Sequence, residues 1–124
     1  MNQNYQIKEL ADSVSSSKKS TLLSSVFKKA LIKKFKNIEI GFIELIDKND
    51  KYYFGKSSDK LKASITVNSQ EFYVFLGSGG TLGVSESYMA GYWESDNLVA
   101  LLQIVLKNRP VLESLDSGIA KLIQ

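Results

Sequence analysis

The sequence predicts an α+β fold in which a small antiparallel sheet packs against several helices. Apolar residues recur at helical spacing near the N-terminus, and three short strand-like segments follow between residues 38 and 67. Helical spacing then returns and continues to the C-terminus. The 124 residues suffice for one hydrophobic core, and no repeat or long linker divides them. We therefore expect one domain over residues 21–124, preceded by a flexible tail or short helix over residues 1–20.

The first predicted helix runs from Thr21 to Lys36. Its apolar residues form one stripe at helical spacing: Leu23, Phe27, Ala30, Leu31 and Phe35. Four lysines project mostly to the other side: Lys28, Lys29, Lys33 and Lys36. This pattern is typical of an amphipathic basic helix.

Three strands are predicted in the middle of the chain. Residues 38–46 show a partial period of two, a turn cluster follows over 47–50, and residues 51–55 return as the second strand of a hairpin. Residues 62–67 form a third strand, in which Ala63, Ile65 and Val67 alternate with polar residues. We expect these strands to make a small antiparallel sheet.

The second half of the chain is predicted to be helical. Ser69 is a suitable N-cap for a short helix that ends at Gly77, and a glycine-rich link and one or two helical turns follow. Ser95 or Asp96 would cap a longer helix that stops before Pro110. A last amphipathic helix is expected to carry Leu112, Leu115, Ile119 and Leu122.

Composition limits the chemistry that the chain can perform. It contains no histidine and no cysteine, which removes the usual general base, thiolate nucleophile and soft metal ligands. Carboxylates, lysines and tyrosines remain, but no carboxylate pair is placed for catalysis. The chain also has no secretory signal and no apolar run long enough to span a bilayer. We therefore expect a cytoplasmic protein with no catalytic, cofactor-binding or metal-binding residue.

The glycine-rich segment Gly77–Gly83 invites comparison with loops that cradle a dinucleotide or S-adenosylmethionine. Its spacing does not fit, because Leu82 occupies the position of the last glycine of the dinucleotide fingerprint. A Rossmann unit also requires a parallel strand after the helix that follows the loop, and no such strand is predicted here. The segment is better explained as a helix C-cap followed by a flexible turn.

Charge and aromatic residues are unevenly distributed along the chain. The net charge is +3, but the lysines are concentrated in the first third of the chain. A basic surface there could bind anionic lipid, nucleic acid or an acidic protein, or it could be an ordinary solvent-exposed helix face with no partner. Tyr88, Tyr92 and Trp93 cluster in the second half and suit either an interface or a core. Because nucleic-acid platforms interleave the two residue types, this separation argues against a nucleic-acid partner.

The segment from Leu82 to Leu98 resembles the signature of cyclopropane-fatty-acyl-phospholipid synthases. The amino-terminal domain of that family carries the pattern Leu-Gly-x-x-Glu-[Ala/Ser]-Tyr-Met-x-Gly-x-Trp, which residues 82–93 match. The specific core runs from Glu86 to Trp93, and weaker similarity covers residues 21–122. One position departs: Ala90 stands where the family commonly has Asp.

The resemblance implies a non-catalytic amino-terminal domain with a fold like that of sterol carrier proteins. Such a domain would help to engage membrane phospholipid and position a carboxy-terminal methyltransferase domain. That catalytic domain, with its S-adenosylmethionine and bicarbonate, is absent from this chain. The expected partners are an anionic phospholipid surface at the inner face of the membrane, the methyltransferase domain and a second copy of the chain. The alternative is a structural docking or dimerisation module that does not bind lipid itself.

Nine residues are the candidates for this lipid or domain interface. They comprise the lysines of the first helix and the specific core of the motif: Lys28, Lys29, Lys33, Lys36, Glu86, Tyr88, Met89, Tyr92 and Trp93.

Overall fold

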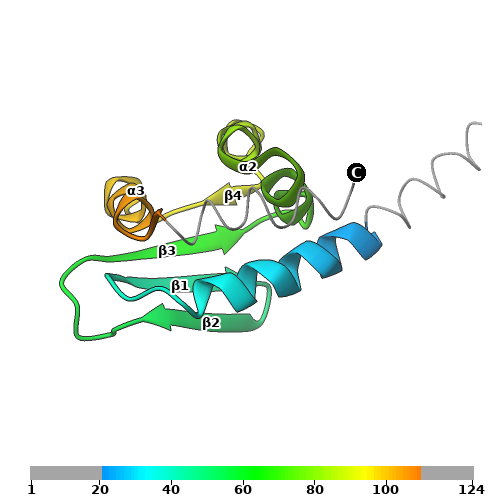
Figure 1. Cartoon of the computed structure of the whole chain (residues 1–124). Helices are drawn as coiled ribbons and strands as arrows, with labels where there is room; N and C mark the ends of the chain where they lie inside the picture. The colour runs from blue at the N-terminus through cyan, green and yellow to red at the C-terminus, as the bar shows by residue number, and fades with distance from the viewer. Residues whose placement is uncertain (1–20, 110–124) are drawn as a thin grey trace, which may run out of the picture.

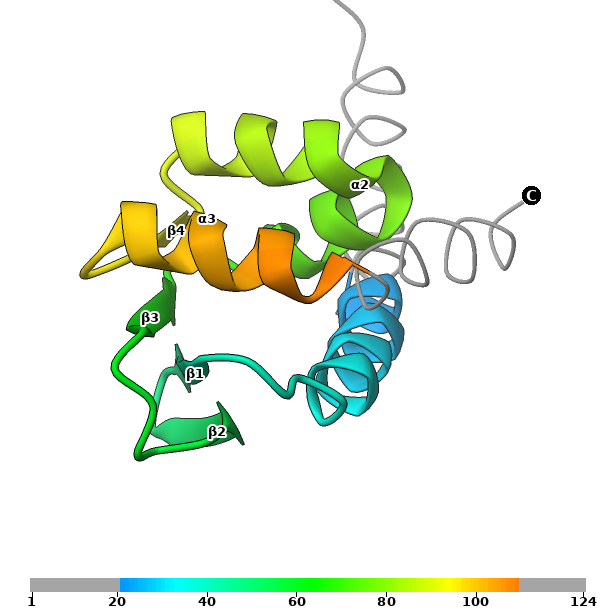
Figure 2. The ribbon, with the colours of Figure 1, turned by 60° about the vertical axis from the view of Figure 1, so that its left-hand side comes forward.

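The computed structural model describes residues 21–109 and places a four-stranded sheet against helices (Figures 1 and 2). An N-terminal helix is present over residues 21–35. The other elements follow in the order β1 (Phe42–Asp47), β2 (Asp50–Gly55), β3 (Lys62–Val67), α2 (Glu71–Met89), β4 (Trp93–Glu94) and α3 (Leu98–Lys107). The predicted α+β class is therefore confirmed.

Alternation along the strands builds the core on one face of the sheet. In β1, Ile43 and Leu45 are fully buried, whereas their neighbours on the other face are only partly buried. The buried residues of β3 alternate in the same way. Apolar residues of the helices complete a single core cluster with them, which includes Phe27, Leu31 and Ile104. Burial of such side chains contributes roughly 1.5–3 kcal/mol each.

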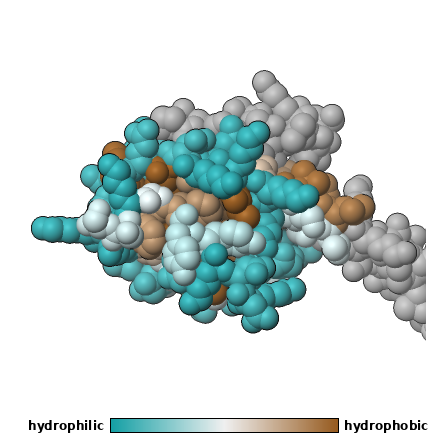
Figure 3. All heavy atoms as spheres, turned by 90° about the horizontal axis from the view of Figure 1, so that it is seen from below, coloured by the Kyte–Doolittle hydropathy of each residue, from teal (hydrophilic) through white to brown (hydrophobic). Residues whose placement is uncertain are grey.

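The strand order is β2-β1-β3-β4, and the central pair β1 and β3 is parallel. The expectation of an all-antiparallel sheet is therefore wrong, although β1–β2 and β3–β4 pair antiparallel. The parallel pair arises because the loop over residues 56–61 carries the chain from β2 past the start of β1. β2 thus forms one edge of the sheet, and Figure 3 views the molecule from that side.

Close contacts and hydrogen bonds hold the loop over residues 56–61 in place where it passes the start of β1. Gly55 has a φ of 86°, and a side chain there would collide with the carbonyl oxygen of Gly41. The Asp59 carboxylate accepts hydrogen bonds from the Gly41 nitrogen at 2.8 Å and the Leu61 nitrogen at 3.0 Å. The backbone of Phe42 donates to the Leu61 carbonyl at 2.9 Å, which starts the parallel pairing.

α2 spans Glu71–Met89, but non-helical backbone angles at Gly80 (φ 55°, ψ −131°) divide it into two helical segments that meet at a kink. The prediction of two helices separated within the glycine-rich segment is therefore confirmed, although the first segment continues past Gly77 and a single residue, not a longer link, makes the break. Gln70, rather than Ser69, occupies the N-cap position, although the Ser69 hydroxyl accepts a hydrogen bond from the Glu71 nitrogen.

Close packing accounts for the glycines around this kink. A side chain at Gly77 would collide with the ring of Phe27, and one at Gly83 would collide with the carbonyl of Phe75. Gly79, in contrast, faces open space. The glycine-rich segment therefore lies within the two helical segments of α2, and two of its glycines are required by close packing.

α3 is fixed at both ends by asparagine side chains. Asn97, and neither Ser95 nor Asp96 as expected, is the N-cap, and its side chain accepts from the Ala100 nitrogen at 3.1 Å. At the other end, the amide of buried Asn108 donates to the carbonyls of Ile40 and Ile104 and accepts from the Ile40 nitrogen. The predicted N-terminal tail and the last amphipathic helix lie outside the described residues.

Candidate functional site

The Glu86–Trp93 motif forms the turn that joins α2 to β4. Gly91 has a φ of 78°, a conformation that glycine adopts without strain, and its nitrogen donates to the Tyr88 carbonyl. The Tyr92 carbonyl then accepts from the nitrogens of Asn68 and Ser69, the residues that link β3 to α2. The motif therefore holds both ends of α2 together.

Trp93 lies in the core and not at an interface. It is 4% exposed, and its indole nitrogen donates to the Ser87 hydroxyl at 3.0 Å and the Val84 carbonyl at 3.2 Å. Its ring contacts Phe72 and Tyr88. Tyr92 is half-buried and stacks on Phe75.

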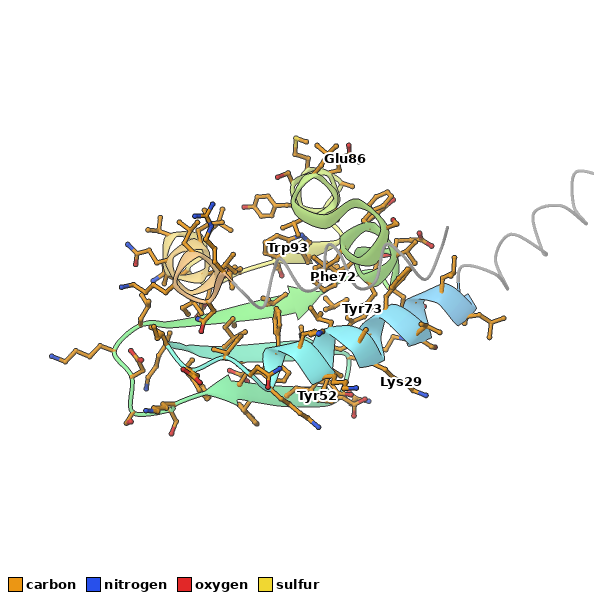
Figure 4. The ribbon with its side chains drawn as sticks, in the orientation of Figure 1. Lys29, Tyr52, Phe72, Tyr73, Glu86 and Trp93 are labelled. Atoms are coloured by element: carbon orange, nitrogen blue, oxygen red, sulfur yellow. The ribbon has the colours of Figure 1, made fainter. Side chains whose placement is uncertain are left out.

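The remaining motif residues are exposed on the outer end of α2. Met89 is 79% exposed and Tyr88 is 42% exposed, and Glu86 is also exposed and points away from the sheet (Figure 4). Ala90 is exposed at the C-cap position of α2, so the carboxylate that the family commonly has there would not enter the core.

Three of the four predicted lysines are exposed, two on the N-terminal helix and one in the turn directly after it, and are here called the lysine stripe: Lys29, Lys33 and Lys36. Among the described residues, none of the three takes part in a salt bridge. Leu22 and Val26 continue the same face toward the start of the helix, 70% and 51% exposed. Figure 4 shows Lys29 and Glu86 at opposite edges of the molecule, so the structure does not bring the lysines and the motif together.

Lys28 turns inward and leaves the stripe. Its ammonium lies 2.6 Å from Oδ2 of Asp47, a residue that is only 2% exposed at the end of β1. The same carboxylate accepts from the Tyr73 hydroxyl at 2.7 Å and from the Gln70 amide at 2.9 Å. The ammonium also lies over the rings of Tyr52 and Tyr73, at 5.3 and 5.7 Å from their centroids. The cluster joins the N-terminal helix, the β1–β2 hairpin and α2.

The cluster shifts the pKa of each charged group toward its ionised form. Burial alone would raise the pKa of Asp47, but hydrogen bonds from Lys28, Tyr73 and Gln70 and the charge of Lys28 hold it below its usual value. Burial would likewise lower the pKa of Lys28, but the hydrogen bond to Asp47 and its charge raise it. Burial and the bond to Asp47 raise the pKa of Tyr73.

These contacts make the cluster a structural link between the N-terminal helix, the β1–β2 hairpin and α2. All three donors meet the Asp47 carboxylate, and no buried side-chain nitrogen or oxygen in residues 21–109 lacks a hydrogen-bond partner. Within the same residues, no group of three or more Asp or Glu side chains is arranged to hold a metal ion.

Sequence reasoning missed Asp47 because it was assigned to the turn. The signal was present: continuing the alternation of Ile43 and Leu45 by two residues places Asp47 on the buried face. Its partners cannot be found by spacing, since Lys28 and Gln70 lie 19 and 23 residues away in the sequence.

Comparison with known proteins gives no relative: no family, no curated protein and no solved structure matches the chain. None of the helices in the described part of the chain combines the length and hydropathy needed to cross a bilayer.

Proposed function

We propose that this chain is a non-catalytic domain that engages the surface of an anionic phospholipid membrane, as the amino-terminal domain of a cyclopropane-fatty-acyl-phospholipid synthase would. One observation carries the proposal: the outer face of the N-terminal helix bears exposed apolar residues followed by the lysine stripe. In the sequence, these residues lie at positions 22, 26, 29, 33 and 36, so the steps of four and three keep them on one face.

This combination matches the requirements of a helix that lies on a membrane. Apolar residues such as Leu22 and Val26 insert at the boundary with the acyl chains, while lysines contact anionic headgroups. The opposite face of the helix is buried through Phe27, Leu31 and Phe35, so it can bind without leaving the fold. Figure 3 places hydrophobic atoms at this end of the molecule, beside the residues drawn in grey.

The expected binding is weak and reversible. Three lysines contribute about 3 kcal/mol at an anionic surface, near 1 kcal/mol each. Partial insertion of two apolar side chains adds roughly 2 kcal/mol, below the value for full burial. A total of about 5 kcal/mol corresponds to a dissociation constant on the order of 0.1 mM, which is typical of peripheral association through one element.

Co-sedimentation with vesicles tests this proposal. The chain is expected to bind phosphatidylglycerol vesicles at low salt and to stay in solution with phosphatidylcholine vesicles. The triple variant Lys29→Glu, Lys33→Glu and Lys36→Glu should lose binding.

A second triple variant provides the matched control, because Lys48→Glu, Lys60→Glu and Lys62→Glu change the net charge equally at exposed sites outside the helix. The control is expected to retain most of the binding. Absence of wild-type binding at low salt, or equal loss in both triples, would show that the helix face does not engage the membrane.

Docking on another protein domain is the second candidate, favoured by α3. Its buried face carries Leu101 and Ile104, yet Val99, Leu102 and Leu106 are exposed on the other side. Calorimetric titration of the chain against the catalytic domain of a cyclopropane synthase tests this alternative. Leu102→Asp should abolish the heat of binding if α3 is the docking surface, and unchanged heat would exclude α3.

A further inference from the structure

The outer side of α3 is an apolar face that none of the described residues covers. Val99, Leu102 and Leu106 are 67%, 50% and 63% exposed, whereas Leu101 and Ile104 are buried. On a helix with 3.6 residues per turn, the three exposed residues lie within about 60° of one another and opposite the buried face. Figure 1 shows α3 at the margin of the helical layer. The three exposed residues are here called the α3 stripe.

The sequence directly after α3 carries a second apolar row with matching spacing. Its members are separated by steps of three, four and three residues: Leu112, Leu115, Ile119 and Leu122. The α3 stripe has steps of three and four, so both rows follow the same heptad pattern. A row of this kind lies on one side of an amphipathic helix, and burying it requires an apolar partner.

The connection between the two rows restricts how they can meet. α3 ends at Lys107, and the backbone of its C-cap residue Asn108 is no longer helical (φ −112°, ψ 38°). The Asn108 amide donates to the carbonyls of Ile40 and Ile104, which fixes the point where the chain leaves α3. Pro110 follows, and a proline disfavours helical backbone at the residue before it. Two helices joined by about two to five residues form an antiparallel hairpin.

One antiparallel register pairs every residue of the α3 stripe with an apolar residue of the second row. The three pairs are Leu106 with Leu115, Leu102 with Ile119, and Val99 with Leu122. Going back along α3, the steps are four and then three residues, and going forward along the second row they are also four and then three. Equal steps keep the three pairs level, because both helices rise 1.5 Å per residue. The register leaves residues 108–111 for the turn, which is within the usual length of such a connection.

We propose that residues 112–122 fold back as a helix on the α3 stripe and cover it. The occupant is this segment because it is joined to α3 by a short turn, and such a connection gives an effective concentration on the order of millimolar. Another protein that uses α3 would first have to displace the segment, so the fold controls access to this surface. The inference does not depend on membrane binding, which uses the N-terminal helix.

Charge and propensity indicate how the helix would be stabilised. Glu113 and Asp116 fall in its first turns and Lys121 in its last turn, where each interacts favourably with the helix dipole. Gly118 and two serines lower its propensity, and a helix of eleven residues is marginal in isolation. The helix would therefore form only in contact with α3, and protection of its amides from hydrogen exchange reports that contact.

Disulfide cross-linking tests the register, since the natural chain contains no cysteine. Leu102→Cys combined with Ile119→Cys should form a disulfide within one chain under mild oxidation. The matched control combines Leu102→Cys with Ser117→Cys, because Ser117 would point away from α3 while the loop has nearly the same length. The first pair should close at least about tenfold faster than the control pair.

Equal rates for the two pairs would overturn the proposal, because a segment without a fixed position closes loops of similar length at similar rates. Disulfides that form only between two chains would overturn it as well.

Hydrogen exchange tests the cover without engineered cysteines. Amides over residues 112–122 should be protected in the wild type, and Leu102→Asp and Ile119→Asp should each reduce that protection at least about tenfold, because a carboxylate enters an apolar contact. Ser117→Asp is the control on the opposite side of the helix and should retain the protection. Trp93 fluorescence verifies that the rest of the fold is intact. The proposal is overturned if the wild-type segment is unprotected, or if its protection persists in both Leu102→Asp and Ile119→Asp.

Discussion

Replacement of Asp47 by Asn examines the charged cluster with little change in volume. The carboxylate is 2% exposed and accepts from Lys28, Tyr73 and Gln70 at 2.6, 2.7 and 2.9 Å. An Asn amide has only one oxygen, so its NH₂ group must face at least one of these three donors. The substitution therefore removes a buried charge and places an NH₂ group against at least one of these donors, which must then reorient or lose its acceptor.

The expected destabilisation is about 3 kcal/mol. Loss of a hydrogen bond to a charged group costs roughly 1.5–3 kcal/mol, and an unsatisfied buried donor costs roughly 1–3 kcal/mol more. We take the lower half of the combined range because the Lys28 side chain is 22% exposed and can regain water. A loss of this size is a large part of the 5–15 kcal/mol that is typical of a domain.

Urea unfolding at pH 7 measures this loss, with the fluorescence of the single, buried Trp93 as the signal. The pKa of Asp47 lies lower in the folded chain than the usual 3.8, so its contribution is present above pH 3.8 and disappears as the pH falls through the folded pKa. The difference between wild type and Asp47→Asn should therefore narrow at strongly acidic pH. Glu86→Gln, which removes an exposed carboxylate, is the control and should change stability little. A difference below about 1 kcal/mol at pH 7 would refute the assigned role, since it is less than one charged hydrogen bond.

Three further predictions concern stability and follow from the packing. Gly77→Ala should lower the free energy of unfolding by about 1–3 kcal/mol, because the new methyl group would collide with the Phe27 ring. Gly79→Ala, at a position that faces open space, should be neutral or stabilise by about 0.5 kcal/mol. Urea titration measures both changes. Asn108→Ala should cost about 2 kcal/mol through lost hydrogen bonds at the end of α3, and a lowered thermal midpoint would register it. Stability should also fall above pH 10, because the pKa of Tyr73 is near its usual 10.0 in the unfolded chain and higher in the folded chain. Urea unfolding midpoints measured from pH 8 to 11 test this, and midpoints that do not decline would contradict it.

Local periodicity predicted the elements that depend on one buried face. The strand over Lys62–Val67 has the predicted bounds, and the first helix ends within one residue of its prediction. The exact position of the break in α2, at Gly80, could not be predicted in this way, because Gly77 and Gly83 are required instead by contacts with Phe27 and Phe75 in the folded chain. The parallel pairing of β1 and β3 likewise depends on how the loop after Gly55 crosses β1.

For the candidate site as well, spacing within one element could be predicted, whereas contacts between distant residues could not. Helical spacing grouped Lys28 with the lysine stripe, but spacing contains no information on Asp47, which binds this one lysine 19 residues away. Trp93 was equally compatible with an interface and a core, and its bonds to Ser87 and Val84 place it in the core. The exposure of Lys29 and Met89 agrees with the patterns that predicted an interface.

The resemblance motif and the lysine stripe lie at different places in the structure, so what the motif does and what could bind lipid are separate questions. Gly91 and Trp93 serve the turn between α2 and β4, so the most specific part of the resemblance reflects packing and does not itself support lipid binding. The lipid proposal rests instead on the N-terminal helix, at the other edge of the molecule.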